Sequence, residues 1–112
     1  MRDLEVRRER RVRFLHEQDG EPERSLKSEL HGLLRLRSGV ARAYLARVEY
    51  SDTPAYEVAL CIAGPEDPAL VRDVASSFAK QFGRDAHLDI LFLKVNEEAE
   101  VSRVCRPFYE AG

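Results

Sequence analysis

The order of hydrophobic patterns along this chain constrains its fold more than any other feature. Apolar residues alternate with period two in some segments and recur at helical spacing in others, in the order strand, helix, strand, strand, helix, strand. This βαββαβ order is typical of a ferredoxin-like sandwich, in which two helices cover one face of an antiparallel four-stranded sheet. We therefore predict an α+β fold of this kind, with a short further helix near the C-terminus.

Size and composition set the limits of what the chain can be. It has 112 residues, 34% of them charged and 44% hydrophobic, with a formal net charge of -2. A chain of this length buries roughly 65% of its unfolded surface, enough for one core, so we expect a single domain over 11–112. Residues 1–10 are rich in arginine and are predicted as a charged arm or a strand extension.

The compartment is predicted from what the sequence lacks. Residues 1–10 are not followed by the apolar run of a signal peptide, and no run approaches the ~20 residues that span a bilayer. Cys61 and Cys105 are far apart and form no CxxC pair, which fits a reducing compartment. We expect a cytoplasmic protein without a membrane segment.

The first half of the chain is predicted as a strand over 11–17, a helix and a hairpin. The helix begins near Pro22 and ends at Ser38-Gly39, with Gly39 suited to the left-handed conformation that closes many helices. Two strands follow over 40–50 and 56–63, and they form a hairpin. The residues expected to face the helices are Tyr44, Ala46, Val48, Val58, Leu60 and Ile62.

The second half is predicted as a helix that starts at Asp67-Pro68 and stops at Gly83, and then a strand over 88–95. This strand is apolar on both faces, and an exposed apolar patch on a globular protein usually marks a partner surface. We therefore predict a homodimer through the open sheet face. Alternatively, a helix within 96–106 and the closing Pro107-Phe108-Tyr109 cover that face within the chain. The predicted interaction surface consists of Leu45, Ala59, Cys61, Leu91, Leu93 and Val95.

Several of these segments together resemble a known family. The stretch Val40–Ala46, the hairpin into a Val/Leu/Ile strand, the helix end at Phe82-Gly83 and the closing Pro107-Phe108-Tyr109 resemble the C-terminal domain family of the enhanced serine sensitivity protein SseB. The resemblance covers roughly Val12 to Tyr109. It implies a bacterial, cytoplasmic, stand-alone version of this module, and it brings no catalytic residues with it.

No motif in the residues indicates catalysis, a cofactor or a metal. Cys61 lies mid-strand among apolar neighbours and is expected to be an inert packed thiol. His16, His31 and His87 are widely and irregularly spaced, although His16 and His87 would meet if they ended adjacent strands. The glycines form no phosphate loop. We expect a protein that is not an enzyme and holds no cofactor.

Three functions remain as hypotheses. The first is a non-catalytic module that mediates homo-oligomerisation or docking on another protein. The second is an amino-acid sensor of ACT-like type, with Asp19, Gly20 and Glu21 as the ligand-binding turn. The third is RNA binding, which ranks last because the 56–63 strand offers only Tyr56 as a stacking aromatic and the N-terminal arginines are interleaved with acids.

Overall fold

The protein, seen here in a computed structural model, is described over residues 12–51 and 56–111. None of the helices in these residues has the length and apolar character needed to cross a membrane. The predicted arm at 1–10 lies outside the described residues. The elements, in chain order, are β1 (Val12–Glu17), α2 (Glu21–Leu34), β2 (Arg42–Tyr50), β3 (Tyr56–Ala63), α3 (Pro68–Phe82), β4 (Asp89–Phe92), α4 (Val95–Val101) and β5 (Tyr109–Glu110).

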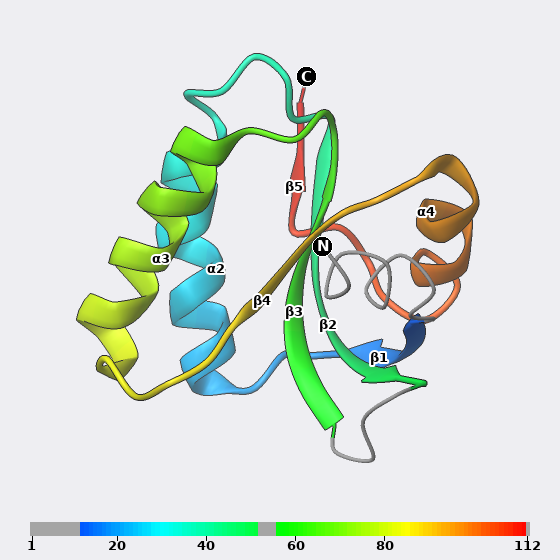
Figure 1. Ribbon diagram of the computed structural model, residues 1–112, viewed down its shortest axis with the longest axis horizontal. Helices are drawn as coiled ribbons and strands as arrows, with labels where there is room; N and C mark the ends of the chain where they lie inside the picture. The colour runs from blue at the N-terminus through cyan, green and yellow to red at the C-terminus, as the bar shows by residue number, and fades with distance from the viewer. Residues whose placement is uncertain (1–11, 52–55, 112) are drawn as a thin grey trace, which may run out of the picture.

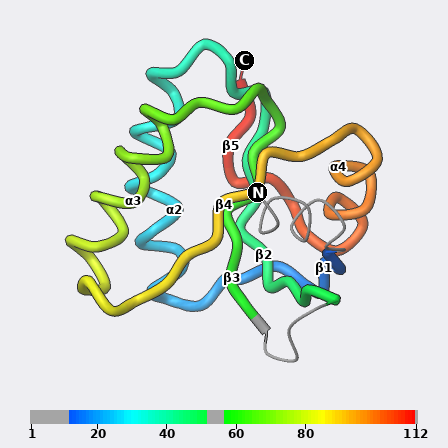
Figure 2. Tube along the Cα trace, in the orientation of Figure 1, coloured from blue at the N-terminus to red at the C-terminus, as the bar shows by residue number. Residues whose placement is uncertain are grey.

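A mixed sheet stands at the centre of the molecule with helices on both faces (Figure 1). α2 and α3 pack side by side against one face, which we call the helix face. α4 lies on the opposite face, which we call the tail face because the C-terminal segment continues along it (Figure 2). The fold is thus of the mixed α/β class, with three layers where two were predicted.

The strand order is β1-β2-β3-β4, and β5 pairs with β2. β1 runs antiparallel to the last residues of β2, while β5 pairs with Arg42 and Ala43 at its start. β2 and β3 form the predicted antiparallel hairpin. β3 and β4 are parallel, so α3 is the crossover connection that parallel neighbours require. This crossover leaves β4 at the edge of the sheet.

The predicted ferredoxin-like antiparallel sheet is therefore not what the described chain forms. That fold splits its βαβ units by an intervening strand, whereas here the two strands joined by α3 are direct neighbours. The order of elements is compatible with both arrangements. β1 and β5 together occupy the outer edge of β2, so the edge of β3 is the one that β4 joins.

The helix face carries the larger core. α2 contributes leucines that recur at helical spacing, and each large side chain buried there stabilises the fold by about 1.5–3 kcal/mol in transfer terms. Partly buried residues such as Phe78 and Phe92 pack around this core. Its buried members are Leu26, Leu30, Leu34, Val40, Ala43, Leu45, Leu60, Ile62, Leu70, Val74 and Tyr109.

The predicted orientation of β2 is wrong. Leu45 pairs with Leu60 across the hairpin, and residues opposite each other in an antiparallel pair share a face, so Leu45 points at α2 and α3. Tyr44, Ala46 and Val48 lie on the tail face instead. Alternation alone does not fix this choice, because both faces of β2 are apolar and both are buried.

The predicted limits of α3 are confirmed, whereas those of its neighbours shift. Asp67 caps α3 by accepting hydrogen bonds from the backbone N–H groups of Ala69 (3.1 Å) and Leu70 (3.2 Å), and Gly83 ends it with φ 91°. α2 ends earlier than predicted, at Leu34, and Gly83 is the only described residue with positive φ, so Gly39 does not close a helix in the left-handed conformation.

The last predicted strand is also shorter than its apolar run. β4 stops at Phe92, and Val95 begins α4. The predicted C-terminal helix exists, but it is confined to the first part of the range 96–106 plus Val95. Apolar residues that read as one strand thus belong to two elements.

Candidate functional site

The tail face is covered largely by the chain itself. Val101 of α4 and Cys105 beyond it are buried against the sheet and form a second core with it. The C-terminal segment thus covers the apolar face within the chain, as the alternative prediction had it. The sheet residues buried beneath them are Phe14, Tyr44, Ala46, Val48, Tyr50, Ala59 and Cys61.

A polar latch fixes α4 on this face. The Tyr44 hydroxyl donates to Glu98 Oε2 at 2.8 Å, and Arg42 Nη2 donates to Glu98 Oε1 at 3.1 Å, with Arg42 Nε bonded to the other carboxylate oxygen. The hydrogen bond from Arg42 lowers the pKa of Glu98 despite partial burial. Burial, followed by the bond to Glu98, raises the pKa of Tyr44 to about 12. Glu98 therefore stays charged and Tyr44 stays neutral around pH 7.

Half of the predicted interaction surface is interior. Leu45 is fully buried on the helix face, and Ala59 and Cys61 are fully buried on the tail face, so these three side chains do not form an exposed surface. Leu45 is buried because its side chain points at α2 and α3. Ala59 and Cys61 are buried because the C-terminal segment covers them. Leu91 and Leu93 are half-buried beside the second core.

What remains open is the β4 edge and its surroundings. Among the described strands, β4 pairs only with β3, and the Leu93 N–H extends this ladder by donating to the Ile62 carbonyl at 2.8 Å. All of β4 is half-buried, and Val95, at the start of α4, is 90% exposed. A cavity of about 710 Å³ adjoins the strand. Its described lining consists of Val12, Tyr50, Glu57, His87, Asp89, Ile90, Leu91, Phe92, Lys94 and Glu97.

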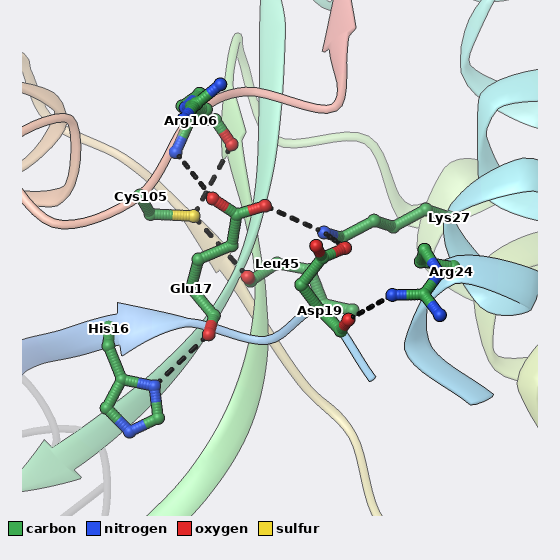
Figure 3. A network of polar contacts seen from close by, with 8 residues as sticks. All are labelled: His16, Glu17, Asp19, Arg24, Lys27, Leu45, Cys105 and Arg106. Carbon is green, nitrogen blue, oxygen red and sulfur yellow. Dashed lines mark hydrogen bonds and ion pairs between the residues drawn. The ribbon is translucent and has the colours of Figure 1, made fainter. Parts of the chain in front are cut away.

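The predicted ligand turn is tied into the fold by its own chain (Figure 3). Lys27 Nζ lies 3.0 Å from both Glu17 Oε2 and Asp19 Oδ1, and Arg24 donates to the Asp19 carbonyl at 2.7 Å. The hydrogen bond from Lys27 lowers the pKa of Asp19. Burial by itself would lower the pKa of Lys27, but its bonds to the two carboxylates outweigh burial and raise it. A ligand ammonium group would have to displace Lys27 from Asp19.

The same network reaches the C-terminal segment. The backbone N–H of Arg106 donates to Glu17 Oε1 at 3.3 Å, and the Cys105 thiol donates to the Leu45 carbonyl at 3.4 Å (Figure 3). β1, α2, β2 and the tail are thus joined at one corner of the molecule. Gly20 precedes α2 there, and Glu21 is its exposed first residue.

Neither thiol is activated. Burial raises the pKa of Cys61, and burial raises that of Cys105 to about 11. Both are free cysteines. At neutral pH they are thiols rather than the thiolates that act as nucleophiles or metal ligands.

The histidines do not come together in the way the sequence allowed. His16 is exposed on β1 and His87 precedes β4, at the opposite edge of the sheet. His31 on α2 packs edge-on against Tyr109, with ring centroids 5.2 Å apart. His87 instead lies beside two carboxylates, Glu57 and Asp89, and the ligand atoms of these three side chains are within 4.8 Å of one another. Sequence spacing gave no sign of this cluster.

Comparison with known proteins identifies the family. The family model described as the SseB protein C-terminal domain matches residues 6–111, nearly the whole chain. The chain belongs to this family, and the resemblance found in the sequence is confirmed over a slightly longer range. Searches of the curated proteins and of the solved structures returned no match.

Proposed function

We propose that this member of the SseB C-terminal domain family is a non-catalytic cytoplasmic module that pairs with a second copy of itself along β4. The observation that carries the proposal is the state of this strand. β4 ends the described sheet with one edge unpaired, and its apolar run continues to Leu93. After Lys94, the exposed Val95 adds one more apolar side chain. An edge strand of this kind is a template for pairing with another chain.

A second copy suits this edge because the strand is complementary to itself. A two-fold axis normal to the sheet pairs two β4 strands antiparallel and keeps like faces together, which makes the contact isologous. Leu91 and Leu93 of one copy then meet the same residues of the other on the tail face, and Phe92 does so on the helix face.

The charges at the ends of the strand favour the same arrangement. Asp89 opens β4 and Lys94 follows it, with only apolar residues between them. Antiparallel pairing brings the Asp89 end of one strand beside the Lys94 end of its partner. Opposite charges that lie near each other at an interface speed association.

The rest of the described chain supports a role without catalysis. Both thiols are protonated at neutral pH because of their raised pKa values. The carboxylates with lowered pKa, Asp19 and Glu98, are held in ion pairs that join secondary-structure elements. The free cysteines fit a reducing compartment.

The other two hypotheses have less support. The ACT-like sensor requires the Asp19 turn to receive a ligand, and its carboxylate already binds Lys27. For RNA binding, Phe14 on β1 and Tyr50 on β2 are buried, so they are not free to stack on bases.

The oligomeric state of the purified chain tests the proposal. Light scattering at micromolar concentration is expected to give a dimer. Val95→Glu is expected to shift it to the monomer, because antiparallel pairing brings this position beside the Asp89 end of the partner, where a second carboxylate is repelled. Leu36→Glu is the matched control, because Leu36 is 78% exposed but lies just after α2, away from β4. Its dimer should be unchanged.

Two results would count against the proposal. A strictly monomeric wild-type chain would rule out self-pairing at these concentrations. A dimer that Val95→Glu leaves intact would place the contact elsewhere. Circular dichroism of both variants would show that the comparison is between folded proteins.

A further inference from the structure

We propose that Glu57, His87 and Asp89 form a binding site for one divalent first-row transition-metal cation of the Zn²⁺ type. Each of the three side chains offers one ligand atom, and these atoms lie within 4.8 Å of one another. The set combines one imidazole nitrogen with two carboxylate oxygens, all of which are ordinary ligands of Zn²⁺.

The sheet register is what brings these residues together. Asp89 pairs with Ala59 in the parallel β3–β4 ladder, and Glu57 lies two residues before Ala59 on β3. His87 lies two residues before Asp89, in the segment that leads into β4. Residues two apart on a strand point to the same face. Glu57 and Asp89 therefore both lie on the tail face, on paired strands, and the His87 ring reaches them from the segment before β4.

The two carboxylates at this position favour binding of a cation. His87 Nε2 is bonded to Asp89 Oδ1, whereas Glu57 has no ion-pair partner among the described residues. Two carboxylates converge here on a part-buried surface, because Glu57 is half-buried and the Asp89 side chain is 21% exposed. Carboxylates brought together in this way repel each other. A bound dication would offset that repulsion, and Lys94 and Glu97 are the other charged groups that line the same cavity.

The geometry suits a small cation with further ligands from solvent. Ligand atoms held at about 2.1 Å from one ion are at most about 4.2 Å apart, so a small rotation of the side chains closes the set. The His87 side chain is 66% exposed, so solvent surrounds most of it and leaves room for this rotation. The adjoining cavity of about 710 Å³ leaves room for water to complete the coordination shell.

The imidazole determines which cations should bind. Mg²⁺ and Ca²⁺ prefer oxygen ligands throughout, while imidazole favours the later first-row metals. The proposed site should therefore bind Zn²⁺ or Co²⁺ in preference to Mg²⁺.

Isothermal titration of the full chain with Zn²⁺ tests the site, with any affinity tag removed and the protein first treated with chelator. One ion per chain is expected. His87→Ala and Glu57→Gln should each weaken binding by at least about tenfold, as even outer-shell changes at metal sites do. His16→Ala is the matched control, because His16 is also an exposed histidine at a sheet edge and should leave binding unchanged. Mg²⁺ should give no comparable heat.

Unchanged Zn²⁺ affinity in His87→Ala, or equal binding of Mg²⁺, would overturn the proposal, as would the absence of Zn²⁺ binding by the wild type. Should a variant lose its fold, Co²⁺ absorption of the wild type provides a second readout. Tetrahedral or five-coordinate nitrogen and oxygen ligation gives visible bands that the aqueous ion lacks, and a spectrum identical to aqueous Co²⁺ would count against the site.

Discussion

The contact between Glu98 and β2 allows a quantitative test of how α4 is held on the tail face. Glu98 accepts hydrogen bonds from Arg42 and Tyr44, which lie on the strand that forms the centre of the sheet. α4 is only one and a half to two turns long (Val95–Val101), too short to be stable without tertiary contacts. Glu98→Ala removes this latch. Val101 is then the one fully buried side chain that packs α4 against the sheet.

The magnitude follows from the state of Tyr44. Tyr44 is 2% exposed, and its only hydrogen bond from the hydroxyl in the described chain is to Glu98. Leaving a buried donor unsatisfied costs about 1–3 kcal/mol. Tyr44→Phe removes the hydroxyl and the bond together, so we expect it to cost less, about 1 kcal/mol. In the double variant no buried donor is left over, and the two changes should therefore be non-additive.

Urea unfolding of the wild type, the two single variants and the double variant gives this coupling free energy. A value of about 1 kcal/mol or more is expected, within the range found for residues in direct contact. Glu100→Ala is the matched control, because Glu100 is an exposed glutamate on the same helix, and its effect should stay within about 0.5 kcal/mol. Additive single changes would refute the latch.

Three further predictions concern pH, the thiols and the helix glycines. The pKa of Glu98 is lowered from its ordinary value of 4.5, so its stabilising effect is fully present above pH 4.5 and is lost as pH falls below it. The difference in unfolding free energy between wild type and Glu98→Ala should therefore disappear in acid. A difference that stays constant with pH would contradict this. Cys61 and Cys105 should react with a thiol reagent at neutral pH only as fast as the protein opens, and rapid labelling of the native chain would show that the thiols are accessible. Gly83→Ala should lower stability by about 1–3 kcal/mol because φ is 91° there, whereas Gly32→Ala inside α2 should raise it by about 0.5–1 kcal/mol, and equal effects in thermal unfolding would contradict the backbone argument.

The local signals in the sequence predicted the helices well. Asp67 and Pro68 set the start of α3 and Gly83 sets its end, because capping and positive φ are determined by neighbouring residues. Leu26, Leu30 and Leu34 of α2 lie four residues apart, a spacing that places them on one helical face, and all three are buried. The exception is the end of α2, where the predicted closing glycine, Gly39, lies several residues beyond the last helical turn.

These local signals did not predict how distant segments pack against each other. Both faces of β2 are covered, so alternation carried no information about whether Leu45 or Tyr44 faced α2 and α3. The proposed metal site depends on the pairing of β3 with β4, which brings Glu57 close to His87, 30 positions away in the sequence. Neither the parallel pairing nor its register is encoded in residue spacing.

The latch and the proposed dimer are linked, and one variant examines both. Glu98 holds α4 in place, and Val95, the first residue of that helix, is the most exposed apolar side chain beside β4. Glu98→Ala changes no residue of the β4 edge, yet it loosens the element that positions Val95. If self-pairing uses Val95, this variant should dissociate at a higher protein concentration than the wild type while Glu100→Ala does not. A variant that loses stability in urea but keeps the wild-type dimer dissociation constant would show that α4 takes no part in the contact, and would confine the interface to Leu91, Leu93 and the backbone of β4.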